Sequence, residues 1–137
     1  MKLISLVFAL SLGLSSQLAQ ADACDPSGGF NEACVDYVLS SVGYDRARAV
    51  RLCSGTVNLD CAEYVLSAVG YDRAKAVAAC KGGVKMECVE YVLSAAGYDK
   101  ERAARACQGH VTVQCIDYTL SSVGYDRLRA AEVCGGN

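Results

Sequence analysis

Apolar residues recur at helical spacing along the chain and then give way to a short turn. A first predicted helix, at about 57–69, is apolar around most of its circumference. The sequence Gly70-Tyr71-Asp72 follows, and a second predicted helix covers about 73–80. Glycine suits the left-handed position that ends a helix, and aspartate is a good N-cap for the next one. The pattern therefore predicts two helices joined by a tight turn.

This helix-turn-helix unit occurs four times, with a period of 27 residues. Two short helices cannot bury their apolar faces alone, whereas stacked repeats share a continuous core. No linker separates the repeats, so we predict one all-α domain over 28–137, stacked as a short right-handed α-solenoid or a compact bundle. The repeats are 28–54, 55–81, 82–108 and 109–135.

Each repeat carries one tyrosine in its first helix and one in its turn. Tyr71 directly precedes the N-cap, where it could pack against Ala76 as a hydrophobic staple. We expect both kinds of tyrosine to be packing residues, since aromatic side chains at helical spacing usually are. A fully exposed row would instead indicate ligand stacking, as in sugar binding. The pairs are 37/44, 64/71, 91/98 and 118/125.

Two cysteines flank the turn of every repeat. The two cysteines of a repeat are a similar number of residues away from the turn. Because each residue rises about 1.5 Å along a helix, they lie at a similar distance from the turn in an antiparallel helix pair. We therefore favour pairing within a repeat, which would stabilise each hairpin by about 3 kcal/mol. The alternative joins Cys53 to Cys61 and so links consecutive repeats; spacing alone does not decide. The eight cysteines are Cys34, Cys53, Cys61, Cys80, Cys88, Cys107, Cys115 and Cys134.

The N-terminal residues 1–21 resemble a signal peptide. Lys2 precedes an apolar run, and an Ala-x-Ala pattern ends at Ala21. The run is shorter than the roughly 20 residues that a transmembrane helix needs, and no later segment qualifies. We expect a secreted or periplasmic protein without a transmembrane segment, in which 22–27 form a short leader.

Cys24 in this leader is the ninth cysteine. If the repeats pair internally, it is left over. It could then stay free, carry a lipid, or join two chains into a dimer. In the alternative pairing it bonds to Cys34, and Cys134 is left over.

The cysteine density favours disulfides over metal. Exported small domains use disulfides to support a limited core. Structural zinc sites usually show cysteines two to four residues apart, and the gaps here are far longer. We expect no metal and no cofactor. A net charge of −2 gives no support for nucleic-acid binding, which favours a strongly basic domain.

The chain lacks a credible set of catalytic residues, and we expect no enzyme. His110 is the only histidine and occupies a loop position that varies between repeats. The repeated serines have no repeated base to activate them. They are Ser40, Ser67, Ser94 and Ser121.

Charged residues form repeated columns. Acids in the first helix either solvate it or align into a polar track; they are Asp36, Glu63, Glu90 and Asp117. Bases begin the second helix, where positive charge opposes the helix dipole. They either pair with caps and neighbouring acids, or form a binding edge for an acidic partner. They are Arg46, Arg73, Lys100 and Arg127, and two positions on, Arg48, Lys75, Arg102 and Arg129.

The design is similar to that of exported bacterial repeat proteins built from disulfide-stapled helix hairpins, whose repeats are longer and whose cysteines lie closer together. The resemblance is one of architecture and assigns no functional residue. From this architecture we expect an interaction module that binds a protein or a glycan, and this partner could be acidic. The alternatives are a structural, stress-resistant envelope protein and a metal-binding thiol protein.

Overall fold

The computed structural model of the chain describes residues 30–136. In this part the chain is helical, with eight α-helices and two 3-10 turns, so the all-α prediction is confirmed. The predicted signal peptide, the leader and Cys24 lie outside the described residues. The elements are α1 (Glu32–Val38), η2 (Leu39–Val42), α2 (Arg46–Leu52), α3 (Leu59–Val65), α4 (Arg73–Ala79), α5 (Met86–Val92), α6 (Lys100–Ala106), α7 (Val113–Thr119), η3 (Leu120–Val123) and α8 (Arg127–Gly135).

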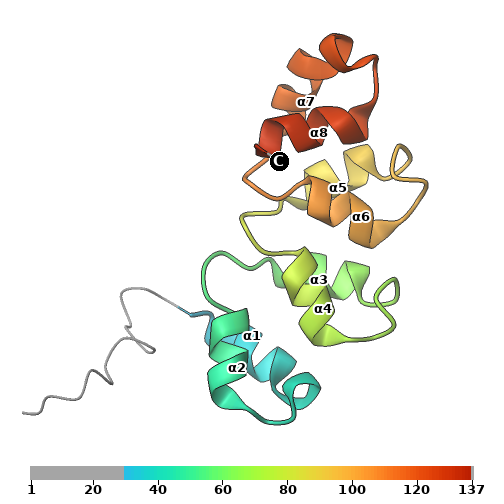
Figure 1. The fold of residues 1–137 in the computed structure, drawn as a ribbon. Coiled ribbons are helices and arrows are strands. Elements are labelled where there is room, and N and C mark those ends of the chain that lie inside the picture. The colour runs from blue at the N-terminus through green and yellow to red at the C-terminus, as the bar shows by residue number, and fades with distance from the viewer. Residues whose placement is uncertain (1–29, 137) are drawn as a thin grey trace, which may run out of the picture.

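Consecutive helices pair into four hairpins that follow one another along a single axis (Figure 1). The Gly-Tyr-Asp turns lie along one side of this stack, and the connections between repeats lie along the opposite side. Within the stack, the first helix of each repeat contacts the second helix of the next: α1 meets α4, α3 meets α6, and α5 meets α8. The stack therefore has two distinct edges and two distinct ends.

Each hairpin is closed by a disulfide within the repeat, as favoured from the spacing. The bonds join Cys34 to Cys53, Cys61 to Cys80, Cys88 to Cys107 and Cys115 to Cys134, with Cα–Cα separations of 5.7, 5.7, 5.9 and 6.1 Å. An alanine in the middle of every second helix is completely buried, at Ala49, Ala76, Ala103 and Ala130. This small side chain lets the two helices of a hairpin approach closely enough for the bond.

The turn has the hydrogen bonds that glycine and aspartate predict. In the first repeat Gly43 has a φ of +67°, and the Tyr44 N–H donates to the Leu39 carbonyl at 2.8 Å. Asp45 then caps α2, because its side chain accepts from the Arg48 N–H at 2.9 Å. The pairing of a left-handed glycine with the backbone bond that reaches back five residues is a Schellman motif.

The first helix of a repeat is shorter than predicted. In repeat two it begins at Leu59 rather than near Val57, because Asn58 is the N-cap and its side chain accepts from the Cys61 N–H at 3.0 Å. Val57 instead forms an isolated antiparallel bridge with Lys81 at the open end of the hairpin. The prediction missed this start because Val57 continues the apolar pattern without being helical.

The connecting loops stack on one another and hold the repeats in register. The Gly82 N–H donates to the Thr56 carbonyl at 2.9 Å, and the Gly109 N–H donates to the Gly82 carbonyl at 2.8 Å. The Asn58 side-chain amide donates to the Val84 carbonyl of the next repeat at 2.9 Å. None of the described helices has the length and apolar character to cross a membrane.

Candidate functional site

The four turn tyrosines form an exposed row. The exposed fractions of their side chains are 74, 74, 75 and 75% for Tyr44, Tyr71, Tyr98 and Tyr125. The prediction that Tyr71 packs as a hydrophobic staple is therefore wrong. The Schellman turn places this residue outside the helix pair and leaves its ring in solvent. The turns that carry these tyrosines lie along one side of the stack (Figure 1), so the four residues belong to one edge of the molecule.

Each turn tyrosine also has a strained backbone. Their φ values are +61, +61, +63 and +62° for Tyr44, Tyr71, Tyr98 and Tyr125. A left-handed conformation costs a residue with a Cβ about 1–2 kcal/mol, and glycine or asparagine would adopt it more easily. Folding therefore does not explain why tyrosine occupies this position in all four repeats. Strain of this kind is a reason to look for a function.

The tyrosines of the first helices have a different role, because they join neighbouring repeats. Tyr37, Tyr64 and Tyr91 are half-buried and pack against the core. A cationic side chain of the next repeat lies over each ring. Arg73 is 5.0 Å from the centre of the Tyr37 ring, Lys100 is 4.3 Å from that of Tyr64, and Arg127 is 4.3 Å from that of Tyr91. These distances are within the range of a cation–π contact.

The acids of the first helices complete the same contact. The Tyr91 hydroxyl donates a short hydrogen bond to Asp117, and this bond is the main reason why the pKa of Tyr91 is raised. Burial raises the pKa of Tyr37, and the Glu63 carboxylate raises it further, although no hydrogen bond of normal geometry joins the two. Two acids of the column, Glu63 and Asp117, thus face the tyrosine of the preceding repeat.

The two basic columns therefore differ. Three of the four bases in the first column contact a tyrosine ring. This contact explains why a base stands at the start of the second helix, where its charge opposes the helix dipole. The bases of the second column are exposed. Of these four bases, only Lys75 forms an ion pair with a described residue, with Asp72 at 4.0 Å. Each lies in the first helical turn after a turn tyrosine. The second column is Arg48, Lys75, Arg102 and Arg129.

A hollow lies between the third and fourth turns, beside the tyrosine row. A serine from the third repeat and a turn tyrosine from the fourth line it together, so the edge is indented between neighbouring turns. Its lining residues are Ser94, Ala95, Leu120, Tyr125, Asp126 and Arg127.

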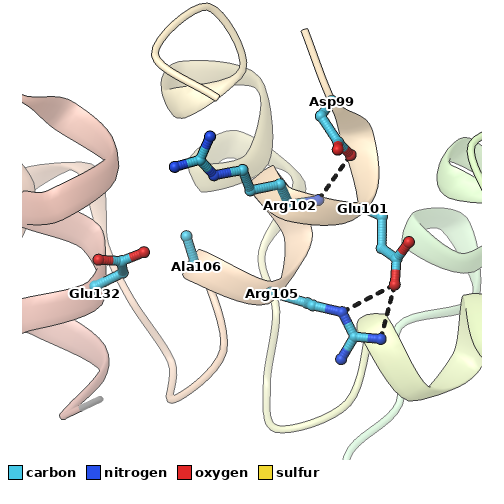
Figure 2. Close-up of a pocket in the computed structure, with 6 residues that line it drawn as sticks. All are labelled: Asp99, Glu101, Arg102, Arg105, Ala106 and Glu132. Atoms are coloured by element: carbon cyan, nitrogen blue, oxygen red, sulfur yellow. Dashed lines mark hydrogen bonds and ion pairs between the residues drawn. The ribbon is translucent and has the colours of Figure 1, made fainter. Parts of the chain in front are cut away.

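A second hollow lies between α6 and α8 (Figure 2). On the α6 side, Arg105 donates to Glu101 at 3.0 and 2.8 Å, so these two charges satisfy each other. The Arg102 side chain and the Glu132 carboxylate, from α8, border the space between the helices in Figure 2. Charges of both signs line this hollow, and most of them have partners. It is therefore a less distinctive candidate for a binding site than the row of turn tyrosines.

His110, the single histidine, lies at a connecting loop. His110 is exposed, and its ring lies where a Cβ on Gly83 would stand, so it packs on a connecting loop. Within residues 30–136, no three histidine, cysteine or acidic side chains are grouped so that they could hold a metal ion.

No known protein family, curated protein or solved structure matches this chain. The chain is thus defined by its own geometry, as a disulfide-rich helical repeat protein with a row of exposed tyrosines.

Proposed function

We propose that the protein is an exported interaction module that binds an acidic polysaccharide along its turn edge. The observation that carries the proposal is the row of four turn tyrosines, each exposed by 74 or 75% on a strained left-handed backbone. Tyrosine offers a large, rigid contact surface that loses little conformational entropy on binding.

The regularity of the row favours a periodic ligand. Four nearly identical rings recur once per repeat along one edge, and packed helices lie about 8–10 Å apart. A polysaccharide repeats its own unit in the same way, and the C–H face of a sugar ring stacks on an aromatic ring.

The second basic column favours an acidic ligand. Arg48, Arg102 and Arg129 are exposed and form no ion pair among the described residues. Each lies one helical turn from a turn tyrosine, so a chain of uronic acids could stack on the rings and meet the cations at once. The four disulfides suit a scaffold that keeps this edge rigid in an oxidising compartment.

The test is binding of alginate, a uronic-acid polysaccharide, by calorimetry, with dextran and poly-glutamate as comparisons. The four-turn variant carries Tyr44→Gly, Tyr71→Gly, Tyr98→Gly and Tyr125→Gly. If each stacked ring contributes at least about 0.5 kcal/mol, the variant binds at least about 30-fold more weakly. Tyr118→Ala removes an exposed tyrosine outside the row and should leave the affinity unchanged.

Poly-glutamate separates stacking from charge. We expect it to bind more weakly than alginate and to be insensitive to the four-turn variant. Equal binding of alginate by the parent and the variant would refute the proposal. Failure to bind either alginate or dextran would favour a structural envelope protein, and selective capture of a protein would favour a protein ligand.

A further inference from the structure

The contact that joins neighbouring repeats has two complementary halves. One half is the first-helix tyrosine of a repeat, and the other is the cation and the acid of the following repeat. For the last junction these are Tyr91 on one side and Arg127 and Asp117 on the other. The first junction has the same arrangement, with Tyr37 facing Arg73 and Glu63. Every internal junction of the described stack therefore sets a ring against a cation, and at the first and last junctions an acid faces the ring as well.

The C-terminal end of the stack presents the ring half without a partner in the described chain. Tyr118 is the counterpart of Tyr91, yet its side chain is 87% exposed. The surrounding face is open as well. Val133 is 53% exposed, whereas its counterparts Ala79 and Ala106 are 0% and 4% exposed. This end is thus an uncovered copy of the inter-repeat surface.

The N-terminal end presents the charged half. Arg46 and Asp36 are the counterparts of Arg127 and Asp117, and both are exposed. No ring from residues 30–136 lies over Arg46, because the described stack has no earlier repeat. Val50 on the same helix is only half-buried, whereas its counterpart Val77 is completely buried.

We propose that copies of this chain associate head to tail, with Tyr118 of one copy packed against Arg46 and Asp36 of the next. The occupant is a second copy because the N-terminal end carries, at the same repeat positions, the kind of cation that the chain sets against its own tyrosines three times and the kind of acid that it sets against them twice. The two contacting surfaces differ, so a growing chain always keeps one free C-terminal end and one free N-terminal end. Such a contact builds linear chains rather than closed dimers.

Thr119 is a polar residue at the C-terminal end of the stack. It stands where the other repeats have the completely buried Val38, Val65 and Val92. Its hydroxyl donates to the carbonyls of Cys115 at 3.0 Å and Ile116 at 3.1 Å, so covering it leaves no unpaired group. The contact between copies is not covalent, so the association is reversible and depends on concentration.

Sedimentation velocity of the oxidised full chain tests the proposal, between about 1 µM and about 1 mM, where weak contacts populate complexes. All samples carry Cys24→Ser, which excludes a disulfide between copies. We expect the average mass to rise with concentration and pass beyond that of a dimer. Tyr118→Ala should raise the dissociation constant about tenfold, from the lost cation–π contact and hydrogen bond. The control Tyr125→Ala removes another exposed tyrosine of the same repeat and should have no effect on the dissociation constant.

A mixing experiment distinguishes head-to-tail contact from any other association. One variant carries Asp36→Lys and Arg46→Glu, which blocks the N-terminal end, and the other carries Tyr118→Ala. Each alone should be mainly monomeric, and their mixture should form a heterodimer and no larger species. A wild-type protein that stays monomeric, a mass that stops at the dimer, an unaffected Tyr118→Ala variant or a mixture without heterodimer would each overturn the proposal. Equal thermal unfolding curves verify that the variants are folded.

Discussion

The guanidinium carbon of Arg127 lies 4.3 Å from the centre of the Tyr91 ring, and this contact joins the fourth repeat to the third. The two residues are 36 positions apart in the chain, so the contact is a property of the stack rather than of either hairpin. The same relationship recurs at each internal junction. It gives the first-helix tyrosine a structural role that the exposed turn tyrosine lacks.

Replacing Arg127 with methionine should destabilise the protein by about 0.5–1 kcal/mol, the contribution of a cation–π contact at an exposed site. Methionine keeps the unbranched side chain and removes only the charge and its donors. Urea unfolding measures the difference. Arg129→Met is the matched control, since Arg129 lies on the same helix and contacts no ring among the described residues. If both variants lose the same stability, the cation–π contact contributes nothing specific.

Alkaline pH should weaken the last junction through Tyr91. Its hydrogen bond to Asp117 raises the pKa of the phenol, so the folded state holds the proton more tightly than the unfolded state. The stability that this bond supplies is complete below the ordinary pKa of about 10 and is lost as the pH rises through the raised folded value. Tyr91→Phe has no such proton to lose.

The measurement is the free energy of unfolding of both proteins between about pH 8 and pH 11, which brackets that ordinary pKa. We expect the wild type to be the more stable at the lower pH and the two curves to converge as the pH rises. A difference that stays constant across this range would show that the hydrogen bond does not couple to stability.

Relieving the turn strain should stabilise the fold. Tyr98 has a φ of +63°, and glycine adopts this conformation without steric cost. After allowing for the greater freedom of glycine in the unfolded chain, we expect Tyr98→Gly to raise the free energy of unfolding by about 0.5–1 kcal/mol. Tyr98→Ala keeps the strain and should be close to neutral. A clear loss of stability in both variants would mean that the ring packs on the fold after all.

The disulfides should open in an order set by burial. Cys115 and Cys134 are half-buried because no repeat of the described chain follows them, whereas the other six bonded cysteines are at most 1% exposed. Mild reduction followed by alkylation and mass spectrometry should therefore label Cys115 and Cys134 first. Simultaneous labelling of all pairs would instead indicate that reduction requires global unfolding.

Deleting a buried disulfide should lower the free energy of unfolding more than deleting an exposed cation–π contact. The double variant Cys61→Ala, Cys80→Ala should lose about 3 kcal/mol of stability, because the unfolded chain regains the freedom of a closed loop. Urea unfolding against the oxidised wild type measures this loss. A change below about 1 kcal/mol would mean that stacking, rather than the bond, holds the hairpin closed.

The sequence predicts much of the architecture because the signals are local and repeated. Gly70 and Asp72 specify how one helix ends and the next begins, and the spacing of Cys61 and Cys80 about that turn indicates their pairing. The helix start was harder to predict. Asn58 caps α3 while the apolar pattern continues back to Val57, and the third repeat has Lys85 at the same position, without a side-chain cap.

The roles of the tyrosines could not be read from one repeat. Whether Tyr64 faces solvent depends on which side of a hairpin the next hairpin covers, and that is decided by packing between repeats. One signal was available: the first-helix tyrosines and the first basic column recur with the same period, which is what a contact between them requires. The exposure of Tyr71 follows from the left-handed position in the Schellman turn.

In the proposed function the turn tyrosines act together as one binding edge. The most direct measurement is the affinity for alginate of four single variants, Tyr44→Gly, Tyr71→Gly, Tyr98→Gly and Tyr125→Gly, each compared with the four-turn variant. We predict similar losses from the four single changes, each at least about twofold, that together approach the loss in the four-turn variant. Unchanged affinity in all four single variants and in the four-turn variant would contradict the claim.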